Sequence, residues 1–180
     1  MNFPELIKTR QSVRKYLPKP VEREKIARCI EAARLAPSAC NSQPWKFIIV
    51  DDADLRENIA GETYNALVTF NKFVKEAPVI AVIVMEKPTM ISQIGGRIKD
   101  KDFYLIDIGI AAEHFCLQAA EEGLGTCMLG WFNEKKIAGM LHIPKNKRIG
   151  LLITLGYSDS SLRDKIRKPT DEILKYNSYE

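Results

Sequence analysis

The chain has 180 residues, 46% of them hydrophobic, and its 27 lysines and arginines against 23 acidic residues give a formal net charge of +4. This length supports one sizeable core, and so small a charge gives no reason to expect a nucleic-acid partner. The sequence has no apolar run of about 18 residues and no signal-peptide pattern at its N-terminus, so we expect a cytoplasmic protein with no membrane partner. We interpret residues 1–180 as a single domain.

Hydrophobic periodicity separates helical from extended segments along the chain, and prolines and glycines mark where they end. The apolar, β-branched run at 78–85 indicates a strand that is buried on both faces. Gly123 stands where a helix C-cap is expected. In chain order, the sequence predicts a helix from Pro4 to Thr9, a helix at 21–35, a strand at 46–50, a helix in two pieces at 53–75 broken near Gly61, the strand at 78–85, a helix at 102–122, a strand at 125–129, a helix at 134–141 and a strand at 149–155.

Three regions carry more specific expectations. In the second piece of the 53–75 segment, Leu67, Val68 and Phe70 are the expected apolar anchors. Residues 86–101 are polar and contain Gly95-Gly96, which is typical of a mobile surface loop. Residues 158–180 are charged and have little apolar content, so they form either a frayed tail or an arm that needs a partner. Alternation of helices and strands by itself favours an α/β class with parallel strands.

The cysteines and histidines do not form a metal-binding pattern. Four cysteines are scattered without C-x-x-C spacing and only two histidines are present, so we expect no metal site. Cys29 and Cys116 lie in helical patterns and are expected to behave as small hydrophobic residues. Cys40 differs from them because it lies in residues 36–45, between a predicted helix and a predicted strand.

Residues 36–45, Ala-Pro-Ser-Ala-Cys-Asn-Ser-Gln-Pro-Trp, place many hydrogen-bonding and backbone-shaping residues between a helix and a strand. Pro37 ends the helix and Pro44 fixes the entry into the strand. A basic segment, Arg-Gln-Ser-Val-Arg, occupies residues 10–14, and Lys-Ile-Arg occupies residues 165–167. Such a loop is typical of a ligand-binding segment, whereas the basic segments taken alone are also typical of solvated surface charges.

With these three segments, the chain resembles the nitroreductase-like FMN-dependent oxidoreductases from Pro4 to about Ile173. The resemblance implies an α+β fold rather than parallel α/β, with a mixed, mostly antiparallel central sheet flanked by helices. It also implies a homodimer whose subunits exchange C-terminal arms, which would give residues 158–180 a place to pack.

The resemblance assigns residues to each part of FMN. Arg10, Lys165 and Arg167 would bind the phosphate with Gln11 and Ser12 beside them, and Arg14 would lie at the pyrimidine edge of the ring. The other FMN-binding residues that it implies are Pro37, Ser38, Ala39 and Asn41 from the opposite subunit, the backbone of Leu129, Gly130 and Trp131 beside flavin N5, and Asn71 near the pyrimidine.

These residue types suit that chemistry. The planar fork of arginine donates several charge-assisted hydrogen bonds to a phosphate. A fixed cation at Arg14 would favour the reduced, anionic ring over the neutral oxidised ring. No protein side chain is assigned as a catalytic acid or nucleophile, because the flavin carries the chemistry.

The function implied is an FMN-dependent NAD(P)H oxidoreductase that reduces nitroaromatics, quinones or a similar electron-poor acceptor. The sequence has no G-x-G-x-x-G after a strand and no G-x-x-x-x-G-K-[ST], which favours a ping-pong scheme in which NADH or NADPH and the acceptor use one pocket in turn. A flavin carrier or sensor without turnover is the alternative. A basic RNA-binding module is a weaker hypothesis, because no recognised RNA-binding motif is present.

Overall fold

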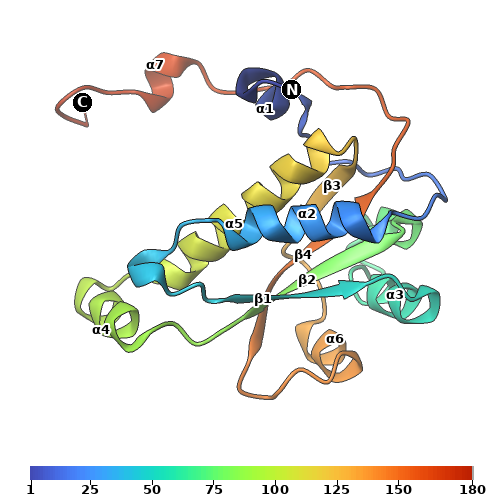
Figure 1. Ribbon diagram of the computed structural model, residues 1–180, viewed down its shortest axis with the longest axis horizontal. Helices are drawn as coiled ribbons and strands as arrows, with labels where there is room; N and C mark the ends of the chain where they lie inside the picture. Colours follow the sequence, from blue (N-terminus) through green and yellow to red (C-terminus); the bar gives the residue numbers. More distant parts are fainter. Residues whose placement is uncertain (180) are drawn as a thin grey trace.

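The computed structural model describes residues 1–179, and a four-stranded sheet lies at its centre (Figure 1). Every neighbouring pair of strands is antiparallel. The parallel arrangement suggested by simple alternation is therefore wrong, and the α+β class implied by the resemblance is confirmed. In the order β1-β2-β4-β3, the strands are β1 (Trp45–Val50), β2 (Val79–Met85), β4 (Arg148–Gly156) and β3 (Gly125–Leu129).

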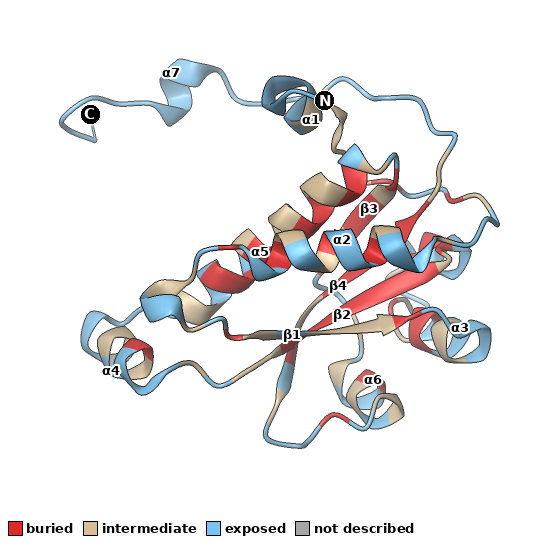
Figure 2. Ribbon diagram, viewed as in Figure 1, coloured by how far each residue is buried: buried red, intermediate tan, exposed pale blue. Residues whose placement is uncertain are grey.

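Helices cover both faces of the sheet, and the buried residues lie between the layers (Figure 2). One face packs against α2 (Arg23–Arg34) and the long α5 (Phe103–Glu121). The opposite face packs against α3 (Ala53–Gly61), the 3₁₀ segment η2 (Lys72–Glu76) and α6 (Glu134–Met140). The remaining elements are α1 (Phe3–Thr9), the 3₁₀ turn η1 (Ala39–Asn41), α4 (Met90–Lys99) and α7 (Thr170–Ile173).

Strand β2 lies in the interior of the sheet and contributes to both cores. Ile80, Val82 and Val84 pack in the cluster that contains α3 and α6. The alternate residues, such as Ala81 and Ile83, pack in the cluster that contains α2 and α5. This confirms that the β-branched run is a strand buried on both faces.

Residues 86–101 do not form the loop that the sequence predicts. They contain α4, whose N-cap Thr89 accepts a hydrogen bond from the backbone of Ser92. Gly96 is needed for close packing: a Cβ there would lie 2.8 Å from the carbonyl oxygen of Lys101. Gly96 therefore permits close packing near the end of a helix, and the interpretation of these residues as a loop was wrong.

The second predicted helical piece, after Gly61, is also wrong. The side chain of Asn65 accepts hydrogen bonds from the backbone N–H groups of Leu67 and Val68, and this turn competes with a helix. Leu67 is 93% exposed and Phe70 is 66% exposed, so neither anchors the core. Phe73 and Val74, in η2, fill that role instead.

Cys29 and Cys116 are buried between α2, α5 and the sheet, as expected for small hydrophobic residues. Burial raises the pKa of both thiols to about 12, so neither is reactive near neutral pH. Cys40 is exposed.

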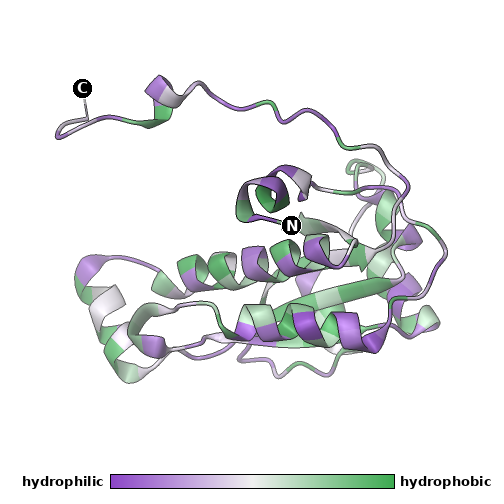
Figure 3. Cartoon of the chain, turned by 45° about the horizontal axis from the view of Figure 1, so that its top comes forward, coloured by the Kyte–Doolittle hydropathy of each residue, from purple (hydrophilic) through white to green (hydrophobic). Residues whose placement is uncertain are grey.

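The C-terminal segment runs along the outside of the molecule and then away from it (Figure 3). It exposes several large apolar side chains, and Ile166 is 92% exposed. Within residues 1–179, no helix combines the length and the apolar character needed to cross a bilayer.

Candidate functional site

The two ends of the chain meet around one hollow of about 400 Å³. The segment between α1 and α2 forms one wall, and the segment that follows β4 forms the other. The structure thus brings together residues that are more than 150 positions apart in the sequence. The lining residues are Arg10, Gln11, Ser12, Arg14, Arg163, Asp164, Lys165, Ile166 and Arg167.

Arg163, which was not among the predicted site residues, holds the two walls together. Its backbone N and Nε donate to Gln11 Oε1 at 3.2 and 3.3 Å, and its Nη2 donates to the carbonyl oxygen of Ser12 at 2.6 Å. A usable signal was present, because basic residues alternate at 163, 165 and 167 and alternate side chains of an extended segment share one side. The hollow therefore has one more cation than expected.

Most of these cations are held by neutral oxygen atoms. Lys165 donates to the carbonyl oxygen of Arg10, and Arg167 donates to that of Ile166. Arg10 pairs with a carboxylate, that of Glu113, at 3.1 Å. Because carbonyl oxygens do not neutralise a charge, the hollow keeps an excess of positive charge despite the presence of Asp164.

The pKa of Lys165 lies below its ordinary value. Partial burial lowers its pKa, and the charges of Arg10 and Arg167 lower it further. An anion bound in the hollow would reverse the effect of those charges. The arrangement thus suits a phosphate, which carries close to two negative charges.

Next to the hollow, the segment carrying Ser12 and Arg14 is fixed against the sheet. Ser12 pairs with Thr126 in a parallel bridge, and the backbone N–H of Val13 donates to the Thr126 carbonyl oxygen at 2.8 Å. The guanidinium of Arg14 lies over the ring of Phe73, 6.0 Å from its centroid. Arg14 is therefore held by β3 and η2 together.

Asn71 is buried and supports the exposed Trp131. Nδ2 of Asn71 donates to the carbonyl oxygens of Thr63 and Trp131, at 3.1 and 3.2 Å. Both amide hydrogens are thus engaged within the chain. The side chain of Asn71 thus fixes the backbone of Trp131, and its contact with FMN stays a prediction.

The end of β3 leaves room for a ligand. Leu129 is buried, whereas Gly130 and Trp131 are exposed. A Cβ added to Gly130 would meet no atom within 4 Å, so open space adjoins this backbone. A flat ligand could therefore approach the chain closely here.

The loop that carries Pro37, Ser38, Ala39 and Asn41 lies elsewhere. Figure 1 shows it beside α4, at the opposite end of α2 from the segment that connects α1 to α2. It lines no part of the hollow described above. Within one chain, these loop residues therefore lie apart from the basic residues, although the resemblance assigns both groups to the same FMN site.

The loop has an unusual backbone. Cys40, Asn41 and Gln43 all have positive φ, between 45° and 52°, and none of them is a glycine. Ser38 Oγ accepts a hydrogen bond from the backbone of Gln43, and Gln43 Nε2 donates to Asn41 Oδ1. Strained backbone of this kind is typical of ligand-binding loops.

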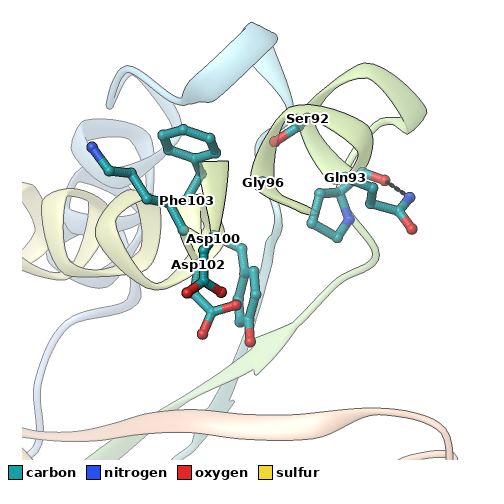
Figure 4. A pocket seen from close by; sticks show the side chains of 9 residues that line it. Ser92, Gln93, Gly96, Asp100, Asp102 and Phe103 are labelled. Carbon is teal, nitrogen blue, oxygen red and sulfur yellow. Dashed lines mark hydrogen bonds between the residues drawn. The ribbon is translucent and has the colours of Figure 1, made fainter. Parts of the chain in front are cut away.

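A second cavity, of about 370 Å³, lies between α4 and the start of α5 (Figure 4). Ser92 and Gln93 project from α4, and Asp102 and Phe103 stand at the start of α5. Burial raises the pKa of Tyr104, and the carboxylate of Asp102 adds to that shift. Because α4 forms one wall, residues 86–101 supply a shaped surface instead of a mobile loop.

Comparisons with known proteins identify relatives of this chain. A model of the nitroreductase family matches residues 7–157. The oxygen-insensitive NADPH nitroreductase of Helicobacter pylori is 28% identical, with 82% of this chain and 81% of that protein covered. A nitroreductase family protein from Clostridium novyi NT is similar in structure, with a TM-score of 0.76, 36% identity and coverage of 91% of this chain and 89% of that one. An FMN-dependent nitroreductase from Clostridium difficile R20291 has a TM-score of 0.77 and 30% identity, covering 97% of this chain and 98% of that one.

Proposed function

The chain belongs to the nitroreductase family, and we propose that it is an FMN-dependent NAD(P)H oxidoreductase acting on a small electron-poor molecule such as a nitroaromatic or a quinone. The names of two relatives support the use of NADPH and of FMN: the Helicobacter pylori protein is an NADPH nitroreductase, and the Clostridium difficile protein is FMN-dependent. We further propose a cytoplasmic homodimer that works by a ping-pong scheme.

The observation that carries this proposal is the basic hollow. Arg163 and Arg167 donate to neutral carbonyl oxygens, which leaves their charge available to a ligand. Lys165, with its lowered pKa, adds a third such cation. A terminal phosphate fits this donor set better than the diphosphate bridge of FAD, because the cations surround one hollow and do not follow a groove.

The surface beyond the hollow suits a flat ring. When bound, FMN would supply the ring that accepts hydride and passes it to the acceptor. Arg14, held over Phe73, would place a cation near that ring, and Asn71 would keep the backbone at Trp131 in position. The open space beside Gly130 would let the backbone approach the ring.

The distance between the hollow and the 37–41 loop supports a site shared between two chains. If the loop contacts FMN, it must come from a second copy, because its own copy holds it beside α4 and α5. The exposed apolar residues of the C-terminal segment, including Ile173 and Tyr176, would then pack against that copy.

Anaerobic spectroscopy of the purified protein tests the proposal. We expect a yellow protein whose released cofactor runs as FMN and whose visible flavin absorption is bleached by NADH or NADPH. Addition of a nitroaromatic or quinone should then restore the colour. A flavin that neither nucleotide reduces would favour the carrier or sensor, and a colourless protein that ignores FMN would overturn the proposal.

Initial rates test the ping-pong scheme separately. With donor and acceptor varied together, parallel double-reciprocal lines are expected, because reduced enzyme forms before the acceptor binds. Intersecting lines would instead require both substrates to be bound at once.

A further inference from the structure

A buried carboxylate lies behind the 37–41 loop, and nothing in the proposed function accounts for it. Asp107 is on α5, only 4% exposed, among the apolar residues that pack α5 against the sheet. Its Oδ1 accepts a hydrogen bond from the backbone N–H of Ala39 at 3.0 Å. Its Oδ2 is buried and, within the described residues, has no hydrogen-bond partner.

A carboxylate in this position is costly for stability. Burying a charged group is unfavourable unless each oxygen is satisfied, and here one oxygen is not. A buried polar atom left without a partner in a folded protein calls for a functional explanation. The neighbouring positions on α5, Ile108 and Ala111, are apolar as the core requires, so Asp107 is an exception on its own helix.

The position of its partner gives the explanation. Ala39 precedes Cys40 and Asn41, the two consecutive residues with positive φ. A positive φ strains the backbone of a residue other than glycine. The loop would therefore relax unless a contact from outside the loop fixed its backbone. The other contacts of Ser38, Asn41 and Gln43 described above lie within the loop itself.

The adjoining contacts of the loop are weaker. The backbone of Thr89, before α4, donates to Ser42 Oγ at 2.9 Å, but this is a bond between neutral groups. The bond from Ala39 to Asp107 is charge-assisted, which makes it roughly twice as strong as a neutral one. It also ties the loop to the longest helix of the fold and not to another surface segment.

We propose that Asp107 is a positioning residue for the flavin site: it holds the strained 37–41 loop in the conformation that presents Ser38 and Asn41 to FMN. This inference rests on the proposed function for the identity of the ligand. The geometric part, that Asp107 orders the loop, does not depend on the ligand.

The test compares Asp107→Leu, Asp107→Asn and a control, Phe115→Leu. Leucine removes the hydrogen-bond acceptor and fills the space. Asparagine keeps one side-chain oxygen, which accepts from the Ala39 N–H, and it loses no bond at the other position because Oδ2 has no partner among the described residues. Phe115 is fully buried on the same helix, about two turns after Asp107, and stacks on Phe47 of β1. Its substitution lowers stability through packing alone.

Hydrogen exchange of the apoprotein is the first measurement. Asp107→Leu should raise exchange most in peptides covering residues 37–43, and Asp107→Asn should raise it less, because it keeps an acceptor for the Ala39 N–H but makes the bond neutral. Phe115→Leu should leave that segment as protected as in the wild type. Unchanged protection in Asp107→Leu would overturn the inference whether or not the protein binds FMN.

FMN affinity is the second measurement. Asp107→Leu should weaken binding about tenfold, which corresponds to about 1.4 kcal/mol, because the ligand must then order the loop. Asp107→Asn should stay within about threefold of the wild type, and Phe115→Leu should lower the melting temperature without changing affinity. If Asp107→Leu and Phe115→Leu behaved alike in both measurements, Asp107 would be a structural residue only. Failure of the wild-type protein to bind FMN would contradict the proposed function and leave the exchange result to decide this inference.

Discussion

The guanidinium of Arg14 lies over the ring of Phe73, with 6.0 Å between its Cζ and the ring centroid. A neutral ring holds this cation in place without cancelling its charge. By contrast, the nearby Arg10 is paired with the carboxylate of Glu113. The two arginines of one short segment thus present different electrostatics, and their removal should have different effects.

Arg14→Ala should lower the midpoint potential of bound FMN. The reduced ring is anionic and would lose a nearby cation, while the neutral oxidised ring would lose little. For a loss of about 1–3 kcal/mol the shift is about 20–65 mV in a two-electron couple. Potentiometric titration measures it, with Lys15→Ala as control, because Lys15 is an exposed neighbour paired with Asp159. Equal potentials in wild type and Arg14→Ala would place Arg14 away from the ring.

Arg167→Ala should weaken FMN binding without changing its potential. Hydrogen bonds to a charged group contribute about 1.5–3 kcal/mol each, so affinity should fall about 10- to 150-fold. The control is Lys168→Ala, which removes the adjacent cation, already paired with Glu172. Fluorescence titration of the apoprotein with FMN measures both. Equal losses in the two variants would show that only the general charge of the segment matters.

Replacing Gly95 and replacing Gly96 by alanine should have different effects on the free energy of unfolding, although the two residues are adjacent in α4. A Cβ at Gly96 would lie 2.8 Å from the backbone oxygen of Lys101, whereas a Cβ at Gly95 would meet no atom within 4 Å. Gly96→Ala should destabilise the fold by about 1–3 kcal/mol, and Gly95→Ala should be neutral or stabilise it by up to about 1 kcal/mol. Urea unfolding measures both, and equal effects would contradict the packing of this helix end.

The same pair shows where sequence reasoning failed. The strands and the longer helices were predictable because their apolar periodicity is strong, and Gly123, which follows the C-cap residue Glu122, ends α5 with φ of 74°. Residues 86–101 were misjudged because a glycine that permits close packing cannot be told from one that permits flexibility. That distinction needs the position of Lys101, which only the folded chain supplies.

The candidate site also contains residues that could be predicted from the sequence and residues that could not. Arg10 and Arg167 were predictable from motifs, whereas Asp107 was not, because a single acid in an apolar helix gives no indication of its partner. The contact of Asn71 with FMN stays a prediction, whereas its hydrogen bonds to Thr63 and Trp131 could not be predicted from the sequence because they join distant segments.

Truncation after Lys168 should abolish dimer formation and weaken flavin binding while leaving the phosphate ligands in place. The removed residues include Ile173, Leu174, Tyr176 and Tyr179, which are exposed in the single chain and would gain a partner in an exchanged arm. Light scattering and FMN titration measure the two effects. A truncated chain that remains dimeric with unchanged affinity would show that the arm is a free tail.

Complementation between damaged chains tests whether the 37–41 loop acts in trans. One chain carries Arg10→Ala with Arg167→Ala, and the other carries Ser38→Ala with Asn41→Ala; each alone should bind FMN poorly. The heterodimer is purified through two different tags. If the loop of one copy completes the basic hollow of the other, this heterodimer contains one intact site and one site with both defects. About half of its sites should then bind FMN normally. If each chain builds its whole site alone, both sites of the heterodimer stay damaged. The separation of loop and hollow in one chain leads us to expect the first result, and a heterodimer that binds no better than either parent would rule out the shared site.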